Sequence, residues 1–126
     1  MKMFSWTRDE LAYEPDYNTH ARRIFPFPGV EEPDWGGAWC VIAPGETSTP
    51  HDHDEKEMFF VIDGDGVIRM GDEERRIGRG DTIFVTPDVR HKITNDGETD
   101  LLFLSIWWDS GVAPADVRER EAAVEA

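Results

Sequence analysis

From residue 37 onward the chain alternates between short apolar stretches and turns that contain glycine or proline, and this alternation limits its folds most. Such stretches, bounded by Gly, Pro, Asn and Asp, are typical of β-strands. No helix-length periodic segment interrupts them, which argues against a fold with crossover helices. The sequence therefore predicts an all-β sandwich or barrel with strands at Ala38–Ala43, Glu57–Ile62, Val67–Met70, Glu74–Ile77, Thr82–Val85, His91–Thr94 and Leu101–Trp108.

A length of 126 residues fits one domain. Residues 1–36 are rich in aromatic, proline and charged residues without sustained periodicity, so we expect an arm that packs on the barrel. This arm should hold one edge strand near Ala21–Phe25. The barrel itself is expected over residues 37–110. Residues 111–126 contain helix formers but few apolar anchors, which predicts a C-terminal tail or a short helix.

The charge and cysteine content exclude several classes of protein. Acidic residues outnumber basic residues by 27 to 13, and the resulting net charge of -14 repels nucleic acids and anionic membrane surfaces. Cys40 is the only cysteine, so no internal disulfide can form. We also find no signal sequence and no apolar run near the roughly 20 residues that span a bilayer. A cytoplasmic protein without a nucleic-acid or membrane partner is expected.

Two of the four histidines form a His-x-His pair, His51 and His53, and Glu57 follows. If this segment is extended, the three side chains share one face, because alternate residues of a strand point the same way. Two imidazoles and a carboxylate suit a divalent first-row metal, and His91 is a candidate fourth ligand. A His-x-His pair alone is also compatible with a solvated turn. We expect His20 to be an ordinary histidine of the arm.

The spacing of these residues resembles the first signature of the cupin family, G-x5-H-x-H-x3-E-x6-G. Gly45, His51, His53, Glu57 and Gly64 occupy its fixed positions.

The second cupin signature, G-x5-P-x-G-x2-H-x3-N, is matched less completely. Gly80, His91 and Asn95 stand in its register, whereas the proline comes one residue late at Pro87 and Asp88 replaces the second glycine. We therefore expect the turn before His91 to differ in shape from the family's usual turn.

The resemblance implies a cupin-type jelly-roll β-barrel that binds one metal ion through His51, His53, Glu57 and His91. Fe(II), Mn(II), Ni(II) and Zn(II) all suit these donors, so the identity of the divalent transition metal stays open. Cupins commonly form dimers, and the resemblance implies a homodimer here. The long apolar run Leu101–Trp108 is expected to be a central strand or a strand covered by a partner subunit.

Four residues are candidates for lining a substrate cavity: Phe59, Val61, Arg69 and Trp107. Phe59 and Val61 share the strand parity of Glu57, although ordinary core packing would give them the same pattern. Arg69 could pair with a substrate carboxylate, as could the nearby arginines, or could be a solvated strand charge. Cys40 is expected to be a small buried apolar residue rather than a reactive thiol.

These features support two classes of function for a protein that takes a small-molecule ligand. The first is an enzyme, with dioxygenase chemistry if iron is bound, or isomerisation, decarboxylation or elimination with zinc, manganese or nickel. Glu57 is then a candidate base as well as a ligand. A narrower form resembles the cupins of specialised metabolism that form N-N bonds. The second class is a cupin that binds or senses a metabolite without turnover.

Overall fold

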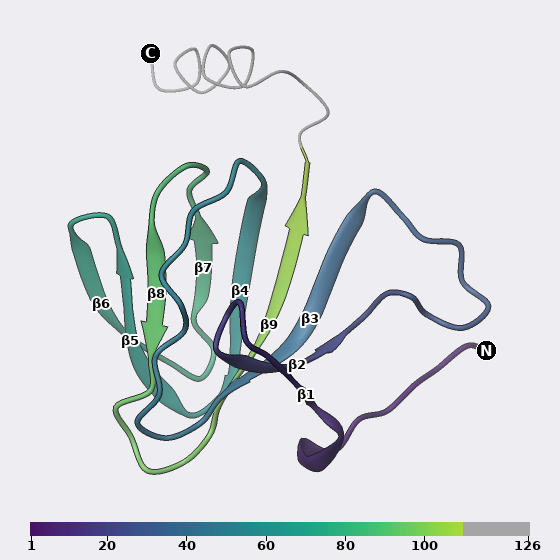
Figure 1. The fold of residues 1–126 in the computed structure, drawn as a ribbon, viewed down its shortest axis with the longest axis horizontal. Coiled ribbons are helices and arrows are strands. Elements are labelled where there is room, and N and C mark those ends of the chain that lie inside the picture. Colours follow the sequence, from purple (N-terminus) through teal and green to yellow (C-terminus); the bar gives the residue numbers. More distant parts are fainter. Residues whose placement is uncertain (110–126) are drawn as a thin grey trace.

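The computed structural model describes residues 1–109, which form one short 3-10 helix and nine β-strands (Figure 1). The helix η1 spans Arg8–Glu10, and the strands are β1 Ala12–Glu14, β2 Thr19–Arg23, β3 Trp35–Ile42, β4 Lys56–Asp63, β5 Asp65–Met70, β6 Glu73–Gly78, β7 Thr82–Val85, β8 His91–Thr94 and β9 Leu101–Trp108. The strands pair antiparallel in a six-stranded sheet of order β1-β2-β3-β9-β4-β7 and a three-stranded sheet of order β6-β5-β8. The predicted all-β fold is confirmed.

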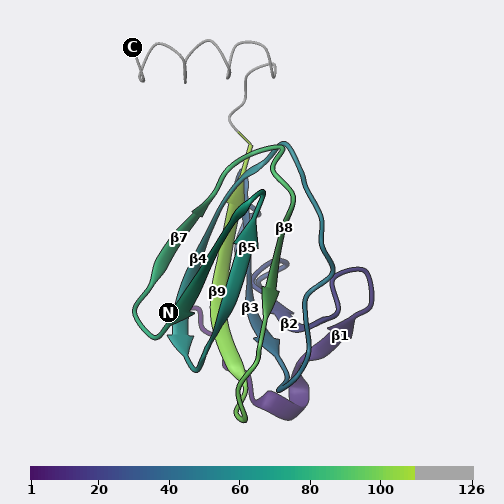
Figure 2. The same ribbon diagram turned by 90° about the vertical axis from the view of Figure 1, so that its left-hand side faces the viewer.

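Side-chain alternation explains why the two sheets pack face to face. In β4, Glu57, Phe59 and Val61 are buried, whereas Met58 and Phe60 between them are only partly buried. Alternate residues of a strand point to opposite faces, so one face of β4 lies toward the interior and the other toward the outside. Figure 2 shows β5 and β8 on one side of the molecule, with β7, β4 and β9 along the other.

The core lies between the inner faces of the two sheets. Ile42, Val85 and Leu101 are fully buried within it. The other buried members are Ala21, Ala38, Cys40, Phe59, Val61, Ile68, Ile77, Ile93 and Phe103. Strand β9 pairs with β3 on one side and with β4 on the other. The apolar run Leu101–Trp108 is therefore a central strand, which was one of the two alternatives predicted from the sequence.

The N-terminal arm contributes two strands to the larger sheet, where the sequence predicted one. Strand β2 lies close to the predicted edge strand and pairs with β3, placing Ala21 opposite Cys40. Strand β1 was not predicted, because Ala12–Glu14 is short and mostly exposed, and its extended conformation depends on pairing with β2. The expected tail or helix over 111–126 lies outside the described residues.

In the turn before His91, Asp88 replaces the second glycine of the second signature and adopts a backbone conformation that is typical of glycine. Asp88 has a φ of 62°, in the left-handed region that glycine adopts most easily and that Asp tolerates better than most residues. Its backbone N–H donates to the carbonyl oxygen of His53 at 2.7 Å. This bond ties the turn of the second signature to the loop that carries the His-x-His pair.

Asn95 has a structural role. Its side chain is fully buried, and its amide group donates to the carbonyl oxygens of Ile42 and Thr99, both at 2.8 Å. Its side-chain oxygen accepts the N–H of Gly97. Asn95 therefore fixes the connection between β8 and β9.

Within residues 1–109 no helix has the length and apolar character needed to span a membrane.

Candidate metal centre and cavity

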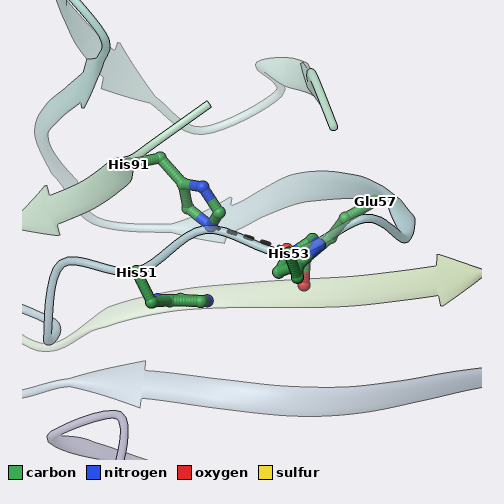
Figure 3. A group of neighbouring side chains, drawn as sticks. All are labelled: His51, His53, Glu57 and His91. Carbon is green, nitrogen blue, oxygen red and sulfur yellow. Dashed lines mark hydrogen bonds and ion pairs between the residues drawn. The ribbon is translucent and has the colours of Figure 1, made fainter. Parts of the chain in front are cut away.

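Four side chains, those of His51, His53, Glu57 and His91, converge at the inner face of the larger sheet (Figure 3). One potential ligand atom from each lies within 4.8 Å of the others. Glu57 is in β4 and His91 begins β8, whereas the two remaining histidines lie in the loop before β4. His20 lies in β2 against the ring of Tyr13 and does not belong to this cluster.

Two backbone features bring the ligands together, and neither is the continuous extended segment that the sequence suggested. His51 and His91 form an isolated antiparallel bridge, with N–H to carbonyl distances of 3.2 and 2.9 Å. Between His53 and Glu57 the chain bends at Asp54 and Glu55 before β4 begins. The assumption of an extended segment is therefore wrong, although the residues it grouped do converge.

Each histidine is oriented by a bond from its Nδ1 to a backbone carbonyl. The accepting oxygens belong to Thr49 for His51 at 2.9 Å, Glu55 for His53 at 3.0 Å and Val89 for His91 at 3.1 Å. Because Nδ1 donates in each of these bonds, Nε2 of a neutral ring keeps its lone pair. Histidines that bind metals are commonly oriented in this way.

The Nε2 atoms of His91 and His53 both lie near the carboxylate of Glu57, but only that of His53 is within hydrogen-bond distance. Nε2 of His91 is buried without any hydrogen-bond partner and lies 3.7 Å from Oε1 of Glu57. Burial lowers the pKa of His91, which favours the neutral ring with a free lone pair. Nε2 of His53 lies 2.9 Å from the same Oε1 while its Nδ1 faces a carbonyl, so both ring nitrogens of His53 lie beside oxygen atoms. The donor set fits a divalent metal.

A serine holds the other oxygen of the carboxylate. The hydroxyl of Ser105 in β9 donates to Oε2 of Glu57 at 2.5 Å, and both side chains are buried. Oε1 is left facing the histidines. Ser105 was not among the site residues predicted from the sequence, although it shares strand parity with the predicted cavity residue Trp107.

The four residues of the cluster are part of the lining of a cavity of about 230 Å³. The lining residues are Glu14, Tyr17, Thr19, Ala21, Arg23, Ala38, Cys40, Ser48, His51, His53, Glu55, Glu57, Phe59, His91, Ile93, Phe103, Ser105 and Trp107. This volume is below the 300–1,000 Å³ typical of drug-sized ligands. The cavity therefore suits a small molecule.

Two of the four predicted cavity residues, Phe59 and Trp107, line this cavity. Val61 is instead part of the buried core, further along β4. Arg69 lines a separate hollow with Pro50, Gly71, Arg90, His91 and Lys92. Its side chain lies on the opposite face of β5 from the buried Ile68, so it points away from the cavity of the metal cluster.

The N-terminal hairpin supplies polar cavity residues that sequence reasoning missed. Arg23 and Glu14 form an ion pair with an N···O distance of 2.6 Å, and the Tyr17 ring lies 5.3 Å from that of His51. One signal was present, since Thr19 and Arg23 share strand parity in β2. Nothing in the sequence showed which face of β2 would turn inward.

Trp107 reaches the cavity because the residue opposite it in β3 is a glycine. A Cβ atom at Gly36 would lie 2.3 Å from Nε1 of Trp107. Any larger residue would therefore displace the indole ring.

Cys40 also lines the cavity, but its chemistry is restrained by burial. The side chain is 8% exposed, and burial raises the pKa of its thiol. The cysteine therefore stays protonated, in agreement with the expectation of a small buried residue.

Comparison with protein families settles the relationship suggested by the two signatures. The model of the cupin domain matches residues 38–107, which is more than half of the chain. The chain belongs to the cupin family. The matched segment contains all four residues of the cluster, whereas the hairpin with Glu14 and Arg23 precedes it.

A solved structure with a similar cupin fold is the plu4264 protein of Photorhabdus luminescens. The two chains are 34% identical with a TM-score of 0.79, and the match covers 86% of this chain and 88% of that one.

Curated relatives match over shorter segments. The tetracenomycin polyketide synthase protein TcmJ of Streptomyces glaucescens is 40% identical over 57 residues, which is 44% of this chain and 38% of TcmJ. An oxalate-binding protein of Thermotoga maritima is 33% identical over 66 residues, 52% of this chain and 54% of that protein. A gentisate 1,2-dioxygenase of a Haloferax species is 35% identical over 57 residues, 45% of this chain and 16% of the enzyme. The chain thus spans about half or less of these relatives.

Proposed function

We propose that this cupin binds one divalent transition metal through His51, His53, Glu57 and His91 and acts as an enzyme on a small organic molecule held beside the metal. The observation that carries the proposal is the buried Nε2 of His91, which has no hydrogen-bond partner and faces three other potential ligand atoms. Leaving a buried polar atom unsatisfied costs about 1–3 kcal/mol, and a metal ion removes that cost.

The metal would supply Lewis-acid chemistry, or redox chemistry if it is iron. The protein contributes three things of its own. Ser105 fixes the carboxylate of Glu57, and the backbone carbonyls fix the imidazoles. Phe59, Phe103 and Trp107 give the cavity an apolar wall that limits the access of water.

Dioxygenase activity is the reaction class we favour if the metal is iron. It draws support from the gentisate 1,2-dioxygenase relative and from a cavity whose apolar lining includes Phe59, Phe103 and Trp107. With zinc, manganese or nickel, the same cavity would suit isomerisation, decarboxylation or elimination. Glu14 and Glu55 also line the cavity, so carboxylates other than Glu57 are within it as candidate bases.

The second candidate function is metabolite binding without turnover. It is favoured by the oxalate-binding relative, which matches over about half of each chain.

Oxygen uptake separates the two candidates. Metal-free protein would be filled anaerobically with Fe(II) or with Zn(II) and then given oxygen and a panel of dihydroxybenzoates, keto acids and thiols. The enzyme proposal predicts oxygen consumption matched by product in the iron form, and loss of this activity in the zinc form and in His91→Ala. Compounds that raise the melting temperature of every metal form without being converted in any of them would instead favour the binding function.

We also propose that two copies associate as a homodimer. Ile62 and Phe84 lie on the outer face of β4 and β7 and are 40% and 47% exposed, which is high for large apolar side chains. Sedimentation analysis of the wild-type protein and of an Ile62→Glu, Phe84→Glu variant would test this. A wild-type monomer at micromolar concentration would contradict the proposal.

A further inference from the structure

The cavity also contains a charged group on β2, which β3 and β9 separate from the strand that carries Glu57. Among the lining residues within the described part of the chain, Arg23 is the only arginine or lysine. It lies at the end of β2, in the arm that precedes the matched cupin segment. The part of the cavity lined by the arm thus carries the ion pair of Arg23 and Glu14.

The guanidinium of Arg23 is held in place and still has donors to spare. One Nη2–H donates to Oε1 of Glu14 at 2.6 Å, and Cζ lies 5.7 Å from the centroid of a Trp107 ring. A guanidinium has five N–H donors. Glu14 takes one of them, and the side chain of Tyr17 also interacts with Arg23 and contributes to its raised pKa. The side chain is 49% exposed, so its remaining donors are available to a ligand.

Two other ion-paired arginines, both in β6, do not share this arrangement. Arg75 pairs with Glu73, and Arg76 pairs with Asp96, on the outer surface where the arginine side chains are 74% and 62% exposed. Neither lines the cavity. Arg22, which is the residue before Arg23, points to the opposite face of β2 and lies over the ring of Phe4.

Between β2 and β4 lie β3 and β9, and their lining residues are apolar except for Ser105, which bonds Glu57. Phe59 and Phe103 pack edge to face with ring centroids 5.1 Å apart, and Trp107 continues this wall toward Arg23. A ligand that spans the cavity therefore needs a short apolar body with polar groups at both ends.

We propose that Arg23 binds the carboxylate of a small organic acid whose oxygen donors at the other end face the metal cluster. Guanidinium groups recognise carboxylates through charge-assisted bonds with defined geometry. Glu14 orients the guanidinium, and its negative charge also opposes the incoming carboxylate. This inference rests on the proposed function, and it names the class of substrate that the cavity selects.

Opposite effects of two variants follow from this arrangement. Arg23→Gln removes the cation and should weaken binding of a carboxylate ligand about tenfold, as expected for loss of a hydrogen bond to a charged group. Glu14→Gln keeps an acceptor for Arg23 but removes the opposing charge, so it should strengthen binding of the same ligand. Arg22→Gln is a matched control, because it changes the net charge equally on the other face of β2.

The experiment measures binding of 3,4-dihydroxybenzoate and of catechol to zinc-filled protein by calorimetry, since zinc permits binding without oxidation. The two probes carry the same pair of adjacent hydroxyls and differ by the carboxylate. The proposal predicts tighter binding of 3,4-dihydroxybenzoate to the wild-type protein and to Arg22→Gln. It predicts that Arg23→Gln removes this preference while the affinity for catechol stays within about twofold, a change of about 0.4 kcal/mol.

Several results would overturn the proposal. These are equal affinities of the two probes for the wild-type protein, equal losses of both affinities in Arg23→Gln, and no binding of 3,4-dihydroxybenzoate. Elemental analysis of the zinc-filled samples makes failure of the proposed function visible separately, since that failure appears as absence of bound zinc. The same probe pair and variants then test Arg23 on the metal-free protein.

Discussion

Ser105 donates its hydroxyl hydrogen to Oε2 of Glu57 at 2.5 Å, in a position where both side chains are buried. The two residues lie on neighbouring central strands, because Ser105 pairs with Phe59, two residues beyond Glu57 in β4. Side chains in such diagonal positions on one face of a sheet can reach each other. The carboxylate is thereby oriented with Oε1 toward the histidines.

Ser105→Ala should lower the affinity for the metal by about 10- to 100-fold, which is the usual effect of removing a partner that orients a ligand. Competition with a chromophoric chelator measures this directly. Ser48→Ala is the matched control, because Ser48 is also buried and lines the cavity but accepts the N–H of Ile93 instead. The control should lose stability and keep its metal affinity. Equal metal affinity in both variants would show that Ser105 does not act on Glu57.

The metal-free protein should become less stable as the pH falls from 7 toward 5. Burial lowers the pKa of His91, whereas in the unfolded chain this histidine titrates at its ordinary value of about 6.5. Below that value the unfolded state binds more protons, so the free energy of unfolding decreases until the pH passes the lower pKa of the folded state.

Urea unfolding of the wild-type protein and of His91→Gln at several pH values tests whether the free energy of unfolding decreases in this way. The variant should lose part of the decrease between pH 7 and 5. Parallel pH dependences for the two proteins would contradict it. Metal binding should weaken over the same range, because ligating imidazoles must be neutral.

Cys40 should resist alkylation in the folded protein. Burial raises the pKa of its thiol, and only the thiolate reacts readily. At pH 8 iodoacetamide should label the protein in urea quickly and the native protein only through unfolding, as mass spectrometry would show. Because the unfolded thiol ionises first as the pH rises above about 8.5, stability should also decrease there. Rapid labelling of the native protein would be inconsistent with this structure.

Asp88 should tolerate glycine better than alanine. Its φ of 62° lies in the left-handed region, where a residue other than glycine costs roughly 1–3 kcal/mol and Asp is among the residues that adopt it most readily. Asp88→Ala should therefore reduce the free energy of unfolding by about 1 kcal/mol, and Asp88→Gly should not. Denaturant midpoints of the two variants measure this difference. If Asp88→Ala were more stable than Asp88→Gly, the left-handed conformation of residue 88 would be refuted.

The sequence predicted the strands of the barrel well because their turns and side-chain alternation are local signals. Thr82–Val85, His91–Thr94 and Leu101–Trp108 have the predicted bounds. The ligand cluster was also grouped correctly from the spacing of the signatures. The geometry of the cluster was not predicted. The bend at Asp54 and Glu55 and the bridge between His51 and His91 depend on contacts between distant segments.

Two features of the N-terminal arm could not be predicted from the sequence. Its polar strand β1 exists through pairing with β2, and the choice of Arg23 over Arg22 as the cavity residue depends on how β2 docks beside β3. Arg69 was predicted either to pair with a substrate carboxylate, as were the nearby arginines, or to be a solvated strand charge, and it lines another hollow. The homodimer and the cytoplasmic location remain predictions.

The central claim is that four side chains hold one metal ion, and metal content per chain tests it most directly. Protein without a histidine tag would be purified anaerobically without chelators and analysed for metals beside a His51→Ala, His53→Ala variant. We predict close to one divalent transition metal ion per wild-type chain and a large loss in the variant, with the fold retained by circular dichroism. Stoichiometric metal in the folded variant, or none in the wild-type protein after exposure to Fe(II), Mn(II), Ni(II) and Zn(II), would contradict the account.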